Sequence, residues 1–192
     1  MRRTLYLARH GETDWNRERR WQGHSDVALN ELGRSQARAL AEDLRRFSIA
    51  QIGASDLSRA RETARIVAGA LALEEVRVDA GLRERGFGVF EGLTEEECTL
   101  HHPEHWASYR SDRILPPGAE PVSVVAARFQ EAVLRFHARH GGGESLLLVS
   151  HGSAIRVFIE SVTGHLPPPM ANGAAYRLVI DGGSFLDVES VR

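Results

Sequence analysis

The sequence from Leu146 to Gly152 reads LLLVSHG. Four consecutive large apolar residues and a serine are typical of a strand that is buried on both faces, in the middle of a mainly parallel sheet. The amphipathic stretch from about Ser153 to Val162, which Gly164 terminates, predicts a helix directly after this strand. A buried strand followed by a helix predicts an α/β protein with helices on both faces of its sheet.

The same alternation of strand and helix extends outward from this segment. Thr4–Ala8 (TLYLA) is a strand candidate, and the tripeptide RHG at 9–11 breaks it. Further strands are predicted at residues 51–55 and 76–79, and helices at about 31–47, 59–71 and 122–140. Asn30 and Ser58 are the predicted caps of the first two of these helices, and the glycines at 141–143 are predicted to stop the third.

The C-terminal segment predicts a β-hairpin, with strands at 175–180 and 184–189 around an Asp-Gly-Gly turn at 181–183. The expected fold is therefore α/β: a three-layer sandwich with a mainly parallel central sheet, helices on both faces and an antiparallel C-terminal edge hairpin. We expect residues 1–192 to form a single domain.

A lid-like insertion is predicted within this domain, at about residues 93–121. Thr94-x-x-Glu97 indicates a capping box at the start of a short helix. The following stretch, 101–118, contains three prolines and is predicted to be irregular.

The composition excludes several classes of function. The 192 residues are 42% hydrophobic and 26% charged with a net charge of −2, which is ordinary for a globular protein and argues against a nucleic-acid partner. All 24 basic residues are arginine, so lysine Schiff bases, pyridoxal phosphate attachment and the P-loop lysine are impossible. The single Cys98 excludes an intrachain disulfide and a multi-cysteine metal site.

Because no apolar run reaches the ~20 residues of a membrane span and the N-terminal run is too short for a signal peptide, we expect a cytoplasmic protein.

Reactive side chains follow the predicted strands, at the ends where the sites of α/β proteins form. They are, in chain order, Arg9, His10, Arg59, Glu84 and His151. If the strands are parallel, these side chains meet at one edge of the sheet. The helix that begins at Gly152 would add its N-terminus, which together with two arginines forms an anion site.

This set of groups indicates phosphoryl transfer through a phosphohistidine. A histidine can act as a covalent nucleophile, a carboxylic acid can protonate a leaving alkoxide, and the arginine fork suits phosphate. General acid catalysis typically contributes about 10²–10⁴-fold, whereas hydrolysis of a phosphate monoester can require up to about 10²¹-fold. The remainder has to come from positioning and from cationic donors around the phosphoryl oxygens.

Ordered sequence blocks resemble the histidine phosphatase superfamily, whose members have the phosphoglycerate mutase-like fold. The blocks are Arg9-His10-Gly11-Glu12-Thr13 (the RHG motif) with Asn16, Gln22-Gly23 with Asp26, Leu29 through Gly33 with Gln36 and Ala37, Ser55 through Ala60 with Thr63-Ala64, Leu82-Arg83-Glu84 with Phe87-Gly88 and Glu91-Gly92, and Val149 through Gly152 with Arg156. The chain departs from the family pattern at Ala28, Asn30 and Phe90, where proline, threonine and tryptophan are frequent.

The resemblance implies a role for each matching residue. His10 would be the nucleophile that becomes phosphorylated, and Glu84 would protonate the leaving group and later activate water. The residues implied to bind the phosphate are Arg9, Asn16, Arg59 and His151, and those implied to lie beside the substrate are Thr13, Gln22 and Gly23. The resemblance implies neither a metal nor a cofactor.

Within this family the chain is most similar to the short phosphatases. Only 66 residues separate Glu84 from His151, whereas cofactor-dependent phosphoglycerate mutases carry an insertion there. The segment 116–120 (PPGAE) resembles the PPGGE stretch of the α-ribazole and broad-specificity phosphatases. We therefore expect a metal-independent phosphatase that acts on a small phosphate monoester.

Three other functions stay open at this point. They are a phosphoglycerate mutase-type phosphoryl transfer, a metal-dependent hydrolase that uses His10 and His151 with a carboxylate, and a phosphate-binding module without catalysis. An edge hairpin would also allow a homodimer.

For several other residues, a purely structural role competes with a functional one. His101, His102 and His105 are predicted to lie in a flexible solvated loop rather than to bind a metal, and with Trp106 they could line the substrate entrance. Cys98 is predicted to lie in a helix and to be unreactive.

Overall fold

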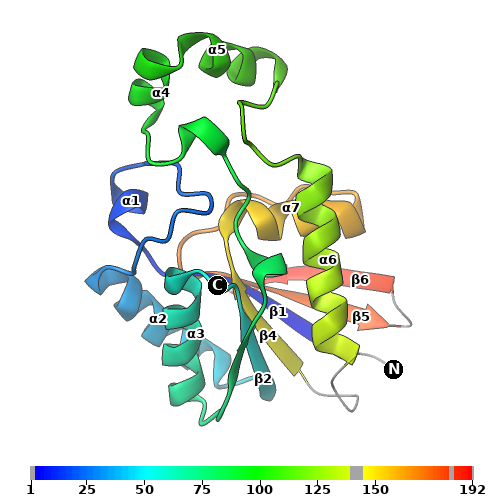
Figure 1. The fold of residues 1–192 in the computed structure, drawn as a ribbon. Coiled ribbons are helices and arrows are strands. Elements are labelled where there is room, and N and C mark those ends of the chain that lie inside the picture. Colours follow the sequence, from blue (N-terminus) through cyan, green and yellow to red (C-terminus); the bar gives the residue numbers. More distant parts are fainter. Residues whose placement is uncertain (1–2, 139–144, 182–183, 192) are drawn as a thin grey trace.

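The computed structural model describes residues 3–138, 145–181 and 184–191. Within them, a mixed sheet lies between two layers of helices (Figure 1). Its strands are β1 (Arg3–Arg9), β2 (Ile49–Ala54), β3 (Val76–Val78), β4 (Ser145–Ser150), β5 (Ala175–Asp181) and β6 (Ser184–Ser190). Their order across the sheet is β3-β2-β4-β1-β5-β6.

The pairing of the strands confirms the predicted fold class. β1 and β2 both run parallel to β4, and β3 runs parallel to β2. β5 lies antiparallel to β1, and β6 lies antiparallel to β5 at the edge. The segment LLLVS is therefore a central strand, with β2 on one side and β1 on the other.

The helices are α1 (Asp14–Arg17), α2 (Glu31–Leu44), α3 (Ser58–Ala70), α4 (Glu95–His101), α5 (Pro103–Asp112), α6 (Val122–Ala138) and α7 (Gly152–Thr163). Short 3₁₀ turns lie at Ala80–Leu82 and Gly88–Phe90. Figure 1 shows α2 and α3 on one face of the sheet and α6 and α7 on the other. None of the helices in the described ranges is long and apolar enough to cross a membrane.

Successive side chains of β4 point to opposite faces of the sheet, so the strand contributes to two hydrophobic cores. Leu146 and Leu148 pack in the cluster that includes α6 and α7, whereas Leu147 and Val149 pack in the cluster that includes α2 and α3. All four are at most 2% exposed, so each adds roughly 1.5–3 kcal/mol of burial free energy. Burial on both faces is the reason that the strand has an uninterrupted apolar sequence.

Several helix ends test the predicted caps. Asn30 caps α2 as expected, accepting a hydrogen bond from the backbone N–H of Gly33 at 2.8 Å, although α2 ends at Leu44 rather than near Phe47. The predicted cap at Ser58 is wrong, because Ser58 is already helical and Leu57 occupies the N-cap position without a side-chain bond. The glycines predicted to stop α6 and most of the predicted hairpin turn lie outside the described residues.

The segment predicted as irregular is largely helical, which corrects the interpretation of 101–118. Pro103 stands at the first position of α5, where a missing N–H is tolerated, so it starts a helix rather than preventing one. His101 is the last residue of α4 and His105 lies within α5, so the histidine cluster is not a loop.

The two helices of this segment, α4 and α5, lie beyond the sheet at the top of Figure 1. They carry a third, mostly aromatic core in which Cys98 is fully buried and Trp106 is 9% exposed. The ring of Trp106 packs 5.4 Å from that of Phe90 and 6.1 Å from that of Trp21. Trp106 is therefore a packing residue, and it does not line the cavity described below.

Candidate active site

A cavity of about 390 Å³ opens where Arg9, the last residue of β1, meets the first turns of α3 and α7. Seven of the residues that the sequence assigns to the site line it: Arg9, His10, Asn16, Gln22, Gly23, Arg59 and Glu84. Residues distant in sequence thus meet at one edge of the sheet, as the strand-end rule predicts. The other three assigned residues, Thr13, His151 and Gly152, are not part of this lining.

His10 follows β1 and is only 3% exposed. Its Nδ1 lies 2.6 Å from the carbonyl oxygen of Gly11. Since a carbonyl only accepts, Nδ1 carries the hydrogen and Nε2 keeps its lone pair. Burial lowers the pKa of His10 well below its ordinary value, and the charges of Arg59 and Arg9 lower it further. The ring is consequently neutral at pH 7, which is the form that can act as a nucleophile.

Two guanidinium groups, the fully buried one of Arg59 and the partly buried one of Arg9, share the cavity with His10. Arg9 Nη1 donates to the carbonyl of Met170 at 2.6 Å, and Arg59 donates to the carbonyls of Ser25 at 2.7 Å and Gly23 at 2.9 Å. Burial lowers the pKa of Arg9 and brings that of Arg59 to about 10, so both stay protonated at neutral pH. Within the described part of the chain, the Nε of each arginine is buried without a hydrogen-bond partner.

His151 stands at the N-cap position of α7 and is fully buried. Its ring centroid lies 5.1 Å from that of His10. Burial, followed by the charge of Arg59, lowers its pKa well below the ordinary value. Neither ring nitrogen has a hydrogen-bond partner among the described residues. Buried polar atoms are nearly always satisfied, so both ring nitrogens are available to a ligand at this site.

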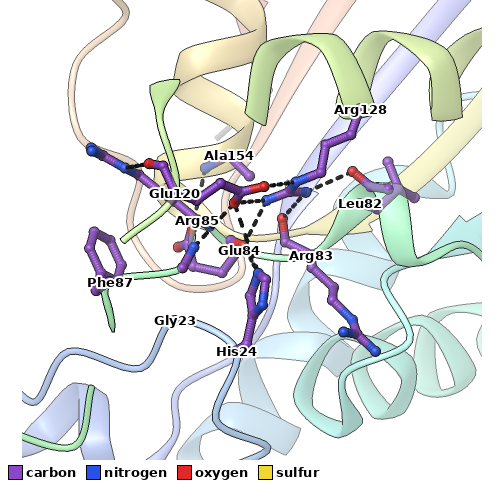
Figure 2. A network of polar contacts seen from close by, with 12 residues as sticks. Gly23, His24, Leu82, Arg83, Glu84, Arg85, Phe87, Glu120, Arg128 and Ala154 are labelled. Atoms are coloured by element: carbon purple, nitrogen blue, oxygen red, sulfur yellow. Dashed lines mark hydrogen bonds and ion pairs between the residues drawn. The ribbon is translucent and has the colours of Figure 1, made fainter. Parts of the chain in front are cut away.

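Glu84 lies across the first turn of α7 (Figure 2). Its Oε1 accepts the backbone N–H groups of Arg85 and Ala154, both at 2.9 Å, and its Oε2 accepts that of Ser153 at 3.2 Å. The carboxyl group is therefore held by three backbone N–H groups, two of which belong to the first turn of α7. The neighbouring Glu91 does not line the cavity, because it bonds instead to the backbone of Phe87.

The turn after His10 leaves no room for a side chain at Gly11. A Cβ on Gly11 would lie 2.2 Å from the carbonyl oxygen of Gly33 in α2. The Gly11 N–H donates to the hydroxyl of Thr63 at 3.1 Å, and that hydroxyl donates to the Arg59 carbonyl at 2.8 Å. Three separate sequence blocks are thus brought together by direct contacts between them.

Thr13 does not line the cavity but bonds to Asn16, which does. It is fully buried and forms a capping box with Asn16, whose Oδ1 accepts the Thr13 N–H at 3.1 Å. Asn172, which the sequence analysis missed, donates to the same oxygen at 3.2 Å and to the carbonyl of His10 at 3.1 Å. No local pattern marks Asn172, because it lies in an irregular segment before β5.

Gly152 also lies outside the lining. A Cβ there would come within 3.3 Å of Arg9 Nε, so the glycine leaves room for that guanidinium.

The outer cavity has further lining residues besides the seven named above. They are Trp15, Arg19, Arg20, Trp21, Phe87, Glu95 and Ser153. The position of Ser153, directly after the strand-end His-Gly pair, is a signal that could have indicated it. Arg20 is bonded to Glu97 and to the carbonyl of Gly92, which connects this wall of the cavity to α4.

The described residues contain no group of three or more histidine, cysteine, aspartate or glutamate side chains placed to hold a metal ion. His10 and His151 lie near each other, but the third ligand of a catalytic metal site is not among their described neighbours.

Comparison with known proteins agrees with this geometry. The sequence profile described as Histidine phosphatase superfamily (branch 1) matches residues 5–186. "Phosphoglycerate mutase-like protein 4" of Arabidopsis thaliana is 40% identical over 160 residues, which are 81% of this chain and 69% of the relative.

Two solved structures have the same fold. YhfR of Bacillus stearothermophilus superposes with a TM-score of 0.86 at 36% identity, over 96% of this chain and 94% of that one. A mycobacterial glucosyl-3-phosphoglycerate phosphatase, solved with VO3, superposes with a TM-score of 0.85 at 33% identity, over 98% and 97%. The family profile spans nearly the whole chain, and the chain belongs to the histidine phosphatase superfamily, branch 1.

Proposed function

We propose that this protein hydrolyses a small phosphate monoester through a phosphohistidine formed at His10. One observation carries the proposal: the buried Nε atoms of Arg9 and Arg59 and both ring nitrogens of His151 have no partner among the described residues. The two arginines line the same cavity as a neutral, buried His10, and the His151 ring lies 5.1 Å from the His10 ring. A phosphoryl group would satisfy these nitrogens and would lie beside the nucleophile.

The first chemical step is attack by His10. The Nε2 lone pair forms a bond to phosphorus as the bond from phosphorus to the ester oxygen breaks. Glu84 supplies a proton to the leaving oxygen, so the alcohol departs neutral and the carboxylate remains. The Nδ1–H bond to the Gly11 carbonyl orients the ring and stabilises the positive charge that develops on the imidazole.

The second step returns the enzyme to its starting state. Water attacks phosphorus, the N–P bond breaks, and His10 recovers its lone pair. Glu84 takes the proton from the attacking water and is ready to act as an acid again. Inorganic phosphate then leaves the site formed by Arg9, Arg59, Asn16 and His151.

The arginines supply the electrostatic part of catalysis. Arg59 is fully buried and Arg9 is partly buried, and in such surroundings a fixed positive charge stabilises the phosphoryl oxygens more strongly than it would in solvent. Because Arg59 is held by two backbone carbonyls, its fork is already oriented before substrate arrives.

We favour hydrolysis over mutase activity because a mutase has to protect its phosphohistidine from water, whereas a phosphatase has to admit it. The short stretch between Glu84 and His151 supports the phosphatase, as does the similarity to a glucosyl-3-phosphoglycerate phosphatase. We further propose that residues 93–121 act as a lid over the outer cavity, to which Glu95 contributes.

The test is hydrolysis of p-nitrophenyl phosphate by the purified protein in EDTA. We expect turnover, and acid-labile phosphate on His10 after a rapid quench. His10→Ala should abolish both signals while the protein remains folded, and His165→Ala, which removes an exposed histidine, should leave both unchanged. An active His10→Ala variant would refute the covalent mechanism, and activity lost in EDTA would favour a metal-dependent hydrolase.

A second measurement addresses the acid. Glu84→Gln should slow hydrolysis of an alkyl phosphate far more than that of p-nitrophenyl phosphate, since only the poor leaving group requires a proton. Equal losses on both esters would argue against the role of Glu84.

A further inference from the structure

Arg128 in α6 bonds to the segment that carries Glu84 and to the side chain of Glu120 (Figure 2). Its Nη1 donates to the carbonyls of Gly81 at 2.9 Å and Arg83 at 2.7 Å, and its Nη2 donates to the carbonyl of Glu84 at 2.8 Å. The remaining two N–H groups bond to Glu120, from Nε at 2.7 Å and from Nη2 at 2.8 Å. A guanidinium has five N–H donors, and all five have an acceptor here.

Glu120 completes the support from the other side. Its Oε2 accepts the N–H of Gly86 at 3.2 Å, its backbone N–H donates to the Gly86 carbonyl at 2.9 Å, and its own carbonyl accepts Arg85 Nε at 2.8 Å. The residues immediately before and after Glu84 are therefore held by the same ion pair. The side chains of Arg128 and Glu120 are only 19% and 16% exposed, so solvent competes weakly for these bonds.

Neither residue is placed to touch the substrate. Arg128 and Glu120 do not line the cavity, and Arg128 has no donor left for a phosphoryl oxygen. Burial alone would raise the pKa of Glu120, but the hydrogen bonds and charge of Arg128 outweigh burial and lower it. Glu120 consequently stays ionised at neutral pH and does not compete with Glu84 as a proton donor.

We propose that Arg128 and Glu120 are positioning residues that hold the Glu84 carboxylate at the first turn of α7, in reach of the leaving-group oxygen. The proposal rests on the function proposed above, in which Glu84 is the acid. Its physical basis is that Glu84 follows a 3₁₀ turn and stands in no helix or strand, so its backbone lacks the regular hydrogen bonds that would otherwise fix it. Arg128 supplies bonds to three carbonyls in this segment, across 44 to 47 positions of sequence.

The experiment compares two esters in Arg128→Met and Arg128→Lys. We measure kcat/KM for an alkyl phosphate and for 2,4-dinitrophenyl phosphate, because kcat/KM includes only steps up to cleavage of the ester bond. Displacement of a catalytic group by about 1 Å can lower the rate about 10²-fold. We expect Arg128→Met to lose about 10- to 10²-fold on the alkyl ester and less than about threefold on the activated ester, which needs no acid. Lysine has only three N–H donors, so Arg128→Lys should recover little.

Two further variants make the test specific. Glu120→Gln keeps the volume of the side chain but exchanges one acceptor oxygen for an amide. It should shift the ratio of the kcat/KM values for the two esters in the same direction as Arg128→Met. It also tests the proposal if Arg128→Met does not fold. Arg135→Met is the matched control. It breaks a bidentate pair from α6 to Asp79 that makes no bond to residues 83–86, so the ratio should not change.

A double variant isolates the route through Glu84. In Glu84→Gln, adding Arg128→Met should produce no further selective loss on the alkyl ester, because the group being positioned is already disabled. An equal loss on both esters in Arg128→Met, or a full additional loss in the double variant, overturns the proposal. If Glu84→Gln is selective for the alkyl ester but folded Arg128 and Glu120 variants are not, only this inference fails. A wild-type protein inactive on both esters overturns the proposed function and this inference with it.

Discussion

Acidification should destabilise this protein through its two buried site histidines. Burial and the nearby arginine charges lower the pKa of His10 and of His151 well below 6.5 in the folded state. In the unfolded chain both rings return to the ordinary value of about 6.5. The unfolded state therefore binds more protons below pH 6.5, so the stabilising contribution is complete above that pH and is lost as the pH falls below it.

The size of this loss in unfolding free energy follows from the number of protons that the chain takes up on unfolding. Each histidine that protonates only on unfolding gives a slope of about 1.4 kcal/mol per pH unit, and two give about 2.7 kcal/mol per pH unit between pH 6.5 and the folded-state pKa values. For a chain of this size, such a change lowers Tm by about 5–11 °C per pH unit. The carboxylates whose pKa is lowered, such as Glu120, contribute at lower pH and do not enter this window.

The assay is urea unfolding at about pH 7.5, 6.5 and 5.5. The double variant His10→Gln/His151→Gln should lose the slope below pH 6.5, whereas His105→Gln/His165→Gln removes two exposed histidines as a matched control. Saturating inorganic phosphate should also flatten the wild-type slope, because a bound dianion stabilises a protonated His151. Equal slopes in the wild type and in His10→Gln/His151→Gln would refute the reasoning.

Three other predictions concern individual contacts. Gly11→Ala should destabilise the fold by about 1–3 kcal/mol, measured by urea unfolding, because the added Cβ meets the carbonyl of Gly33 at 2.2 Å; an unchanged midpoint would show that the turn relaxes freely. Arg59→Lys should weaken binding of inorganic phosphate at least about tenfold in calorimetry, because a lysine cannot keep the fork bonds to two carbonyls while it contacts an oxyanion. The Cys98 thiol, whose pKa burial raises to about 11, should resist iodoacetamide at about pH 8 in the folded protein and react in guanidinium chloride; rapid labelling of the folded protein would contradict its burial.

The placement of the site at one end of the sheet could be predicted because it follows from local patterns. An uninterrupted apolar run, LLLVS, requires cover on both faces, and parallel strands bring their carboxyl ends to one edge. That His10 and Glu84 lie in the same cavity could therefore be predicted without information about long-range contacts. The errors at Ser58 and Pro103 come from residues that are equally compatible with neighbouring helix positions, so tertiary contacts decide between them.

The sequence therefore determined the α/β architecture, the family and the groups that meet at the strand ends, because strand periodicity and ordered motifs are local properties. Only the tertiary structure decided how these groups are held. Met170 bonds to Arg9 across 161 positions, and Asn172 bonds to the carbonyl of His10 across 162. In the sequence, Arg128 looks like an ordinary polar residue of a helix. In the structure, its five N–H donors bond to the segment that carries Glu84 and to Glu120. Such contacts depend on the distance between side chains after packing, which no spacing along the chain encodes.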